Sequence, residues 1–135
     1  MRSIPLLCAA ATLVATLVAS PALALDLNSF RAQHKLPPLA MSSTLAGLAA
    51  SHAQDMASRR RLDHKGFRAR ARRAGSAMAQ NVAFGCATED CVFRMWSRSA
   101  GHRRNMLLRG VSAYGLASAV AANGRRYWVL ELGAE

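Results

Sequence analysis

The chain has 135 residues, and its 18 lysines and arginines outnumber 7 acidic residues, which gives a formal net charge of +11. A chain of this length forms one domain with a hydrophobic core and has no room for a second large domain. The surplus of positive charge predicts attraction to anionic surfaces but does not define a fold. The motifs Gly-x-Ser-x-Gly and His-Glu-x-x-His are absent, so the commonest serine-hydrolase and zinc-protease signatures are excluded.

The first 24 residues have the pattern of a secretory signal peptide. Arg2 provides a charged start, residues 4–25 contain no charge, and Ala22-Leu23-Ala24 is a small-x-small cleavage site. An uncleaved membrane anchor is the alternative, because about 20 apolar residues can span a bilayer, although Pro21 argues against it. We therefore expect residues 25–135 to form a single secreted or periplasmic domain with no stable transmembrane anchor after cleavage.

Two helices are predicted next. Asp26 can cap a helix from Leu27 to about Lys35, and the Pro37-Pro38 pair prevents its continuation. Ser42 or Ser43 opens a second helix, in which apolar residues recur at helical spacing as far as residue 57. This helix ends in three arginines, 59–61, which the negative end of the helix dipole stabilises.

Shorter elements follow. Residues 62–66 are predicted to form a loop, residues 67–74 a basic helix that stops at Gly75, and residues 80–85 a strand. Thr88 can cap a helix that includes Trp96, and another helical turn is expected over residues 101–107. The runs 111–121 and 125–132 are suited to strands, and the Asn123-Gly124 pair between them predicts a hairpin. The fold class is therefore α+β, with helices packed on an antiparallel sheet.

Cys86 and Cys91 are the two cysteines of the exported part. An even pair in an oxidising compartment predicts a disulfide. A metal site is the alternative, but no second cysteine pair or nearby histidine completes one.

An ordered series of short motifs runs through the exported part of the chain. Its fragments are Asn28-Ser29-Phe30-Arg31, Leu36-Pro37-Pro38-Leu39, residues 48–56, Asp63-His64, residues 80–85, Trp96, residues 99–107, Tyr114-Gly115-Leu116 and Tyr127-Trp128. In this order and spacing they resemble the bacterial CAP (SCP-like) domain of the superfamily of cysteine-rich secretory proteins, antigen 5 and pathogenesis-related 1 proteins. The resemblance covers essentially all of residues 25–135, and it implies a three-layer α-β-α sandwich with a C-terminal hairpin.

The resemblance also implies a central cleft in which two histidines and two glutamates meet and can hold a divalent metal. Carried over by position, the histidines are His64 and His102. Gln80 occupies the position of one family glutamate. The second glutamate is expected near Ser99, where this chain has no carboxylate. His64, Gln80, Ser99 and His102 are therefore the candidate cleft residues.

These departures argue against catalysis. Glutamine supplies a neutral oxygen and an amide donor in place of a charged oxygen, and catalytic zinc usually takes three protein ligands. His64 and His102 are at most a weak site for a divalent metal such as zinc, so no cofactor and no catalytic residue are assigned. Asp63 is a possible substitute carboxylate beside His64.

Seven arginines lie between residues 59 and 73, at positions 59, 60, 61, 68, 70, 72 and 73. Such a patch can bind phosphates, or it can simply be a solvated face. Nucleic acid is not an expected partner outside the cytoplasm, whereas an anionic envelope lipid or glycan suits that compartment. The leading hypothesis is a monomeric, exported, non-enzymatic module that binds an anionic or apolar envelope or extracellular ligand through its central cleft and its basic face. The alternative is a divalent-metal-dependent hydrolase that uses His64 and His102.

Overall fold

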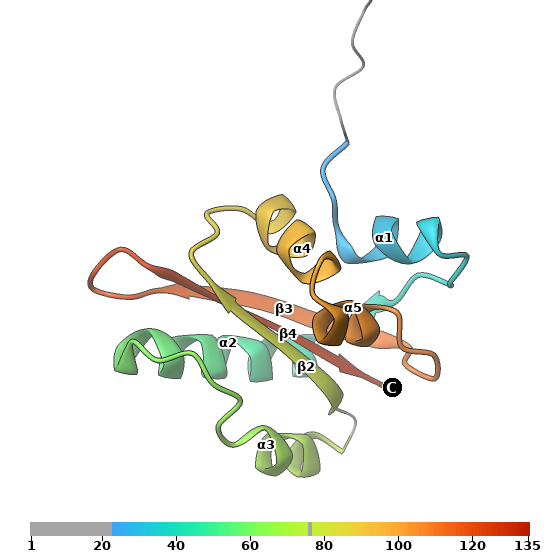
Figure 1. The fold of residues 1–135 in the computed structure, drawn as a ribbon. Helices are drawn as coiled ribbons and strands as arrows, with labels where there is room; N and C mark the ends of the chain where they lie inside the picture. Colours follow the sequence, from blue (N-terminus) through green and yellow to red (C-terminus); the bar gives the residue numbers. More distant parts are fainter. Residues whose placement is uncertain (1–22, 76) are drawn as a thin grey trace, which may run out of the picture.

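The computed structural model describes residues 23–75 and 77–135, so nearly all of the predicted signal peptide lies outside the described residues. Within them, no helix is long and apolar enough to cross a membrane. The elements, in chain order (Figure 1), are α1 (Leu27–Gln33), β1 (Ala40–Met41), α2 (Ser43–Arg59), α3 (Phe67–Ala74), β2 (Ala77–Phe84), α4 (Glu89–Ser97), α5 (Ala100–Met106), β3 (Ala113–Val120) and β4 (Arg126–Gly133).

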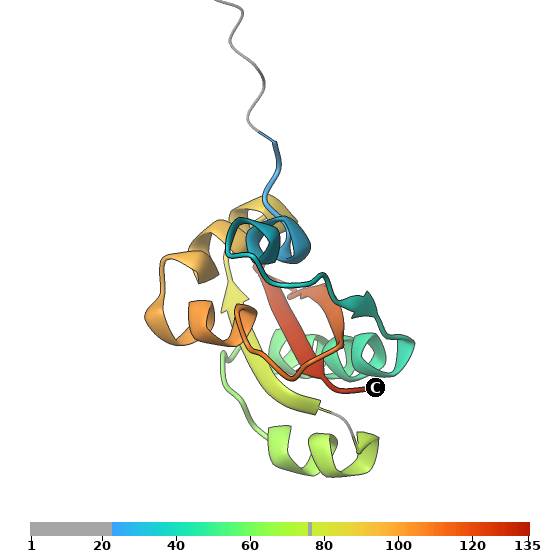
Figure 2. The same ribbon diagram turned by 90° about the vertical axis from the view of Figure 1, so that its right-hand side faces the viewer.

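The strands form one sheet in the order β1-β3-β4-β2. β4 pairs antiparallel with both β2 and β3, and the short β1 pairs parallel with β3. Helix α2 covers one face, with α3 beside it against β2, while α1, α4 and α5 lie on the other face (Figures 1 and 2). The predicted α-β-α sandwich is therefore confirmed.

The side chains of the central strand β4 alternate between two hydrophobic cores. Trp128, Leu130 and Leu132 pack with the helices α1, α4 and α5. Tyr127 and Val129 pack with the small residues of α2 on the opposite face. This alternation is the two-residue period of a strand, and it places Glu131, the next residue of the second set, inside the α2 layer.

Helix α2 approaches the sheet closely at Gly115 of β3. A Cβ atom at this position would overlap the backbone of Leu45 and Ala46, so α2 can pack here only against glycine. Gly115 lies opposite Glu131 in the sheet. The close approach of α2 therefore also helps to remove Glu131 from water.

A buried guanidinium group links segments of the layer that contains α1, α4 and α5. Arg31 of α1 is 1% exposed and donates hydrogen bonds to the carbonyl oxygens of Pro37 (3.0 Å), Met106 (3.0 Å) and Leu108 (2.9 Å). Burial lowers the pKa of Arg31, and Arg109 adds to this effect by repulsion. Arg31 therefore joins α1 to the segment that follows α5.

Most of the predicted elements are confirmed. Asp26, Ser42 and Thr88 cap their helices with side-chain hydrogen bonds, and α3 ends at Gly75, whose φ of 74° is left-handed. Several boundaries differ by one to three residues; for example, α1 stops at residue 33 and β2 starts at residue 77. The two-residue strand β1 was not predicted. The disulfide between Cys86 and Cys91 is present, with a Cα–Cα distance of 5.5 Å.

Candidate functional site

Two of the predicted site residues are joined directly. His64 lies in the loop between α2 and α3, and its Nδ1 atom is 2.8 Å from Oε1 of Gln80 on the edge strand β2. His102 lies on α5, on the other side of this strand. Burial lowers the pKa of His102 first, and electrostatic repulsion from His64 lowers it further. Among residues 23–75 and 77–135 no direct contact joins the two imidazole rings, so their meeting in one cleft stays a prediction.

A network of amides holds His102 in place. Asn81 donates to the backbone oxygen of His102 (3.0 Å) and accepts from Asn105 (2.9 Å), which also donates to the backbone oxygen of Gln80 (3.2 Å). These bonds fix α5 against β2. The His102 ring lies 6.4 Å from the Trp96 ring, and its buried Nδ1 has no hydrogen-bond partner in the described part of the chain.

Ser99 stands apart from the other candidates. It is the N-cap residue of α5, but its side chain forms no capping hydrogen bond. Among residues 23–75 and 77–135, no interaction connects the Ser99 side chain with His64, Gln80 or His102. Its place in the cleft remains a prediction.

The structure reveals a carboxylate that sequence reasoning missed. Glu131 on β4 is the cross-strand neighbour of Gln80, is 0% exposed, and accepts a hydrogen bond of 2.6 Å from Gln80 Nε2. Burial raises its pKa to about 7, although the bond from Gln80 and the charge of Arg70 oppose the rise. The sequence signal was an acidic residue inside an otherwise apolar strand, where a charge is costly unless it has a partner.

Asp63 does not supply the missing carboxylate beside His64. Its side chain accepts from Arg59 at 2.9 Å, and this bond is the main reason that its pKa falls to about 2. Its backbone oxygen lies 2.7 Å from Nε2 of the fully buried His52. Asp63 therefore ties the loop that carries His64 to α2, at Arg59 in its last turn and at His52 in its middle.

The donor set does not suit a catalytic divalent metal. Catalytic zinc usually takes three protein ligands, and the described residues contain no cluster of three His, Cys, Asp or Glu side chains that could hold a metal ion. The Gln80 side-chain oxygen is bonded to His64, and Glu131 is bonded through Oε1 to Gln80 and is fully buried. The side chains outside this buried pair that could bind a metal are therefore the two imidazoles.

A pocket of about 450 Å³ opens beside His64. Phe67 supplies an aromatic wall, and Arg68 and Arg72 of α3 line it as well. These two arginines are exposed, lie one helical turn apart, and form no ion pair within the described residues. Like charges at this spacing repel each other, so an anion bound here would relieve the repulsion.

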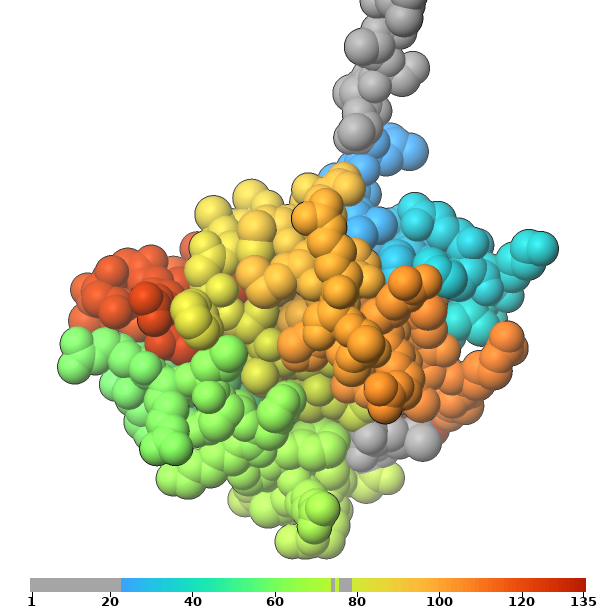
Figure 3. Space-filling model, viewed as in Figure 1, coloured from blue at the N-terminus to red at the C-terminus, as the bar shows by residue number. Residues whose placement is uncertain are grey.

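The predicted basic patch is smaller than the sequence suggested. Arg59 is held by Asp55 (2.6 Å) and Asp63 (2.9 Å), and Arg70 donates to the backbone oxygen of Lys65 (2.7 Å). The segments of α3 and α5 are exposed on the same face of the molecule (Figure 3). The exposed arginines on these two helices are residues 68, 72, 73, 103 and 104.

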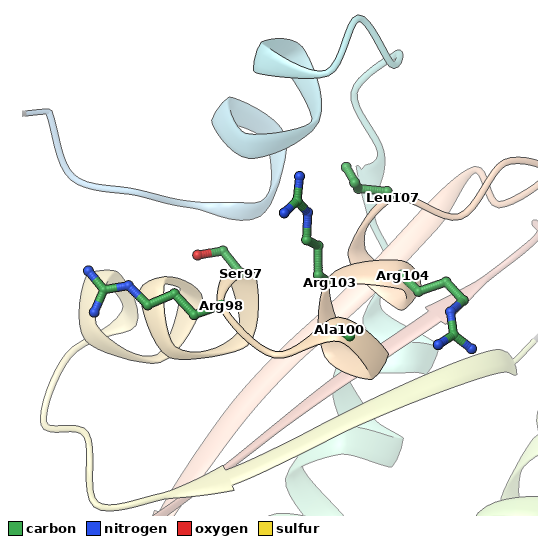
Figure 4. A pocket seen from close by; sticks show the side chains of 6 residues that line it. All are labelled: Ser97, Arg98, Ala100, Arg103, Arg104 and Leu107. Carbon is green, nitrogen blue, oxygen red and sulfur yellow. The ribbon is translucent and has the colours of Figure 1, made fainter.

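A second pocket, of about 600 Å³, lies beside α5, and its lining includes Ser97, Ala100 and Leu107. Figure 4 shows that its arginines, 98, 103 and 104, point in three different directions, with Arg103 directed towards α1. They do not converge on one point. The pocket beside His64 is therefore the better candidate for an anionic ligand.

The sequence profile of the Cysteine-rich secretory protein family, CAP, matches residues 26–132. The chain belongs to this family. Three solved structures share the CAP fold of this protein. An outer surface protein from Borrelia burgdorferi has a TM-score of 0.68 at 17% identity, and the match covers 81% of this chain and 86% of that one.

The other two structures are an extracellular protein containing an SCP domain from Bacillus anthracis (TM-score 0.64, 21% identity) and a cysteine-rich secretory protein from Staphylococcus aureus (TM-score 0.62, 20% identity). Each match covers 81% of this CAP protein but only 38% and 36% of the respective relatives. No curated protein sequence is significantly similar. At these identities the comparisons establish the fold, and the ligand has to be inferred from the site.

Proposed function

We propose that this CAP protein is an exported, non-enzymatic module that binds an anionic envelope component in the pocket beside His64. The observation that carries the proposal is the combination in this pocket of one imidazole, one aromatic ring and arginines 68 and 72, which form no ion pair within residues 23–75 and 77–135. Guanidinium groups bind phosphate and carboxylate groups with paired hydrogen bonds, and Phe67 offers an apolar surface beside them. Lipid headgroups and acidic glycans both have this chemistry.

Export is supported by the signal-peptide pattern of residues 1–24 and by the disulfide. The relatives from Borrelia, Bacillus and Staphylococcus are described as outer surface, extracellular and secretory proteins. A basic protein in this compartment meets anionic lipids and glycans, which makes them the natural ligands to test.

The test is sedimentation of the purified protein with phosphatidylcholine vesicles that contain or lack phosphatidylglycerol, at low salt, with lipopolysaccharide and cell-wall fragments as separate arms. The double variant Arg68→Gln/Arg72→Gln should bind anionic vesicles roughly thirtyfold more weakly, since each arginine at an anionic surface contributes about 1 kcal/mol. Arg98→Gln/Arg109→Gln is the matched control, because it removes the same charge elsewhere, and it should have a smaller effect.

Two outcomes contradict the proposal. If vesicles, lipopolysaccharide and cell-wall fragments all fail to bind at low salt, the protein is not an anion-binding module. If the two double variants lose affinity equally, binding depends on net charge and not on this pocket.

The alternative of a divalent-metal-dependent hydrolase gains no support from the donor set. It is tested by calorimetric titration of zinc into the wild-type protein and into His64→Ala and His102→Ala. We expect no saturable binding at micromolar zinc. Saturable binding to the wild-type protein that either substitution abolishes would instead favour the hydrolase.

A further inference from the structure

The buried Glu131 and Gln80 form a polar row that runs from the inner strand β4 to the edge strand β2. They are opposite each other in the β2–β4 register, are 0% and 5% exposed, and are joined by the bond of 2.6 Å. A carboxylate at both positions would place two negative charges at hydrogen-bond distance, which is unfavourable because one of them would have to keep a proton. Glutamine at position 80 is therefore the side chain compatible with glutamate at position 131.

The ionised form of Glu131, which predominates above its pKa of about 7, fixes the direction of every hydrogen bond in this row. An ionised carboxylate only accepts, so the Gln80 amide nitrogen must then face Glu131 and the Gln80 oxygen must face His64. That oxygen also only accepts, so the hydrogen of neutral His64 must be on Nδ1, 2.8 Å away. The other nitrogen, Nε2, is then left with its lone pair.

The remaining groups around Glu131 do not replace Gln80 as its partner. Arg70 of α3 attracts the carboxylate electrostatically. However, Glu131 Oε2 and the Nε and Nη2 atoms of Arg70 are buried without hydrogen-bond partners among the described residues. His52 of α2 bonds to the Asp63 backbone, and Gly115 of β3 has no side chain. The hydrogen bond that the structure gives Glu131 is the one to Gln80.

We propose that Glu131 is a positioning residue that acts through the Gln80 amide to hold His64 in the Nδ1–H tautomer. Its carboxylate replaces, one strand further into the sheet, the acid that the family places at position 80. The consequence is that His64 presents an acceptor nitrogen, not an N–H group, beyond its bond to Gln80. This inference rests on the proposed function and adds detail to it. Nε2 of His64 can accept a hydrogen bond from a hydroxyl group of the ligand in the pocket.

The experiment is nitrogen-15 NMR of the histidine side chains in the ligand-free protein at about pH 8, where imidazoles are neutral. Long-range proton–nitrogen correlations identify which ring nitrogen carries the hydrogen. His34 and His52 are internal references with opposite tautomers. Nδ1 of His34 bonds to the Phe30 carbonyl at 2.9 Å, and Nε2 of His52 bonds to the Asp63 carbonyl at 2.7 Å.

In the wild-type protein, the proton–nitrogen correlations of His64 should have the same pattern as those of His34, with the hydrogen on Nδ1. In Glu131→Gln the new amide can either donate or accept, so the direction of the row is no longer fixed and His64 should shift towards the Nε2–H tautomer. Gln80→Leu should produce the same shift with Glu131 intact. Unchanged signals of His34 and His52 in both variants demonstrate that the fold is retained.

An Nε2–H tautomer of His64 in the wild-type protein overturns the proposal without any variant. An Nδ1–H tautomer that persists in Glu131→Gln and in Gln80→Leu overturns it as well. Since no ligand is present, these results are independent of the vesicle experiment. The positioning role can therefore fail while anion binding succeeds, and the reverse.

Discussion

Replacing Glu131 by glutamine should make the protein more stable at high pH. The folded protein raises the pKa of this carboxyl from 4.5 to about 7, mainly through burial. A group whose pKa is raised by folding favours the folded state while it is protonated, so this stabilisation is present below pH 4.5 and is lost as the pH rises through 7. The rise corresponds to about 3 kcal/mol, because a tenfold change in proton affinity is worth about 1.4 kcal/mol.

The measurement is urea unfolding of the wild-type protein and of Glu131→Gln at several values between about pH 4 and pH 8.5, a range that covers both pKa values of the carboxyl. The quantity of interest is the difference in unfolding free energy between the two proteins, because the effects of titrating groups that do not interact with Glu131 cancel in it. Burial lowers the pKa of His52 and of His102, and both proteins contain these groups. From the lowest to the highest pH, the unfolding free energy of Glu131→Gln should rise by about 3 kcal/mol relative to that of the wild-type protein.

The control is Glu89→Gln, which removes an exposed carboxylate from the start of α4. Its unfolding free energy relative to the wild-type protein should change by less than about 1 kcal/mol over the same pH range, as expected for a surface charge at a helix N-terminus. If Glu131→Gln behaves like Glu89→Gln, the buried carboxylate does not titrate as argued. If its relative stability instead falls as the pH rises, the sign of the reasoning is wrong.

Three further substitutions test the packing. Gly115→Ala should destabilise the protein by more than about 3 kcal/mol in urea unfolding, because its Cβ would overlap backbone near Ala46 that cannot move without displacing α2; near wild-type stability would contradict the close approach. Arg31→Met should cost about 3 kcal/mol or more, because three carbonyl groups lose a charged donor; a thermal melt unchanged from wild type would refute this. Cys86→Ser/Cys91→Ser should cost about 2 kcal/mol, since the loop is short; complete unfolding of the variant would show a larger role.

Local sequence signals were sufficient to predict most of the elements. The caps at Asp26, Ser42 and Thr88 act within one helical turn, and the Asn123-Gly124 turn joins strands that are adjacent in the chain. The strand β1 could not be predicted in this way. It has only two residues, and its pairing with β3 depends on contacts more than 70 residues away in the sequence.

The candidate site was predicted less completely, for the same reason. The link between His64 and Gln80 followed from a family resemblance, whereas the bond between Gln80 and Glu131 depends on the register of two strands 51 residues apart. Periodicity marked the strand that contains Glu131 but not which face that residue occupies. The hydrogen bonds of Arg59 and Arg70 could not be predicted from the sequence either, because a run of arginines does not show which residues each side chain contacts.

The contacts of Arg31 impose an order on folding. Two of the carbonyl groups that it contacts lie 75 and 77 residues further along the chain, and the backbone of Leu25 bonds to Asp90, which is 65 residues away. The β3–β4 hairpin, by contrast, joins neighbouring segments and can form early. The N-terminal helix can therefore make these contacts only after the chain has been made as far as Leu108.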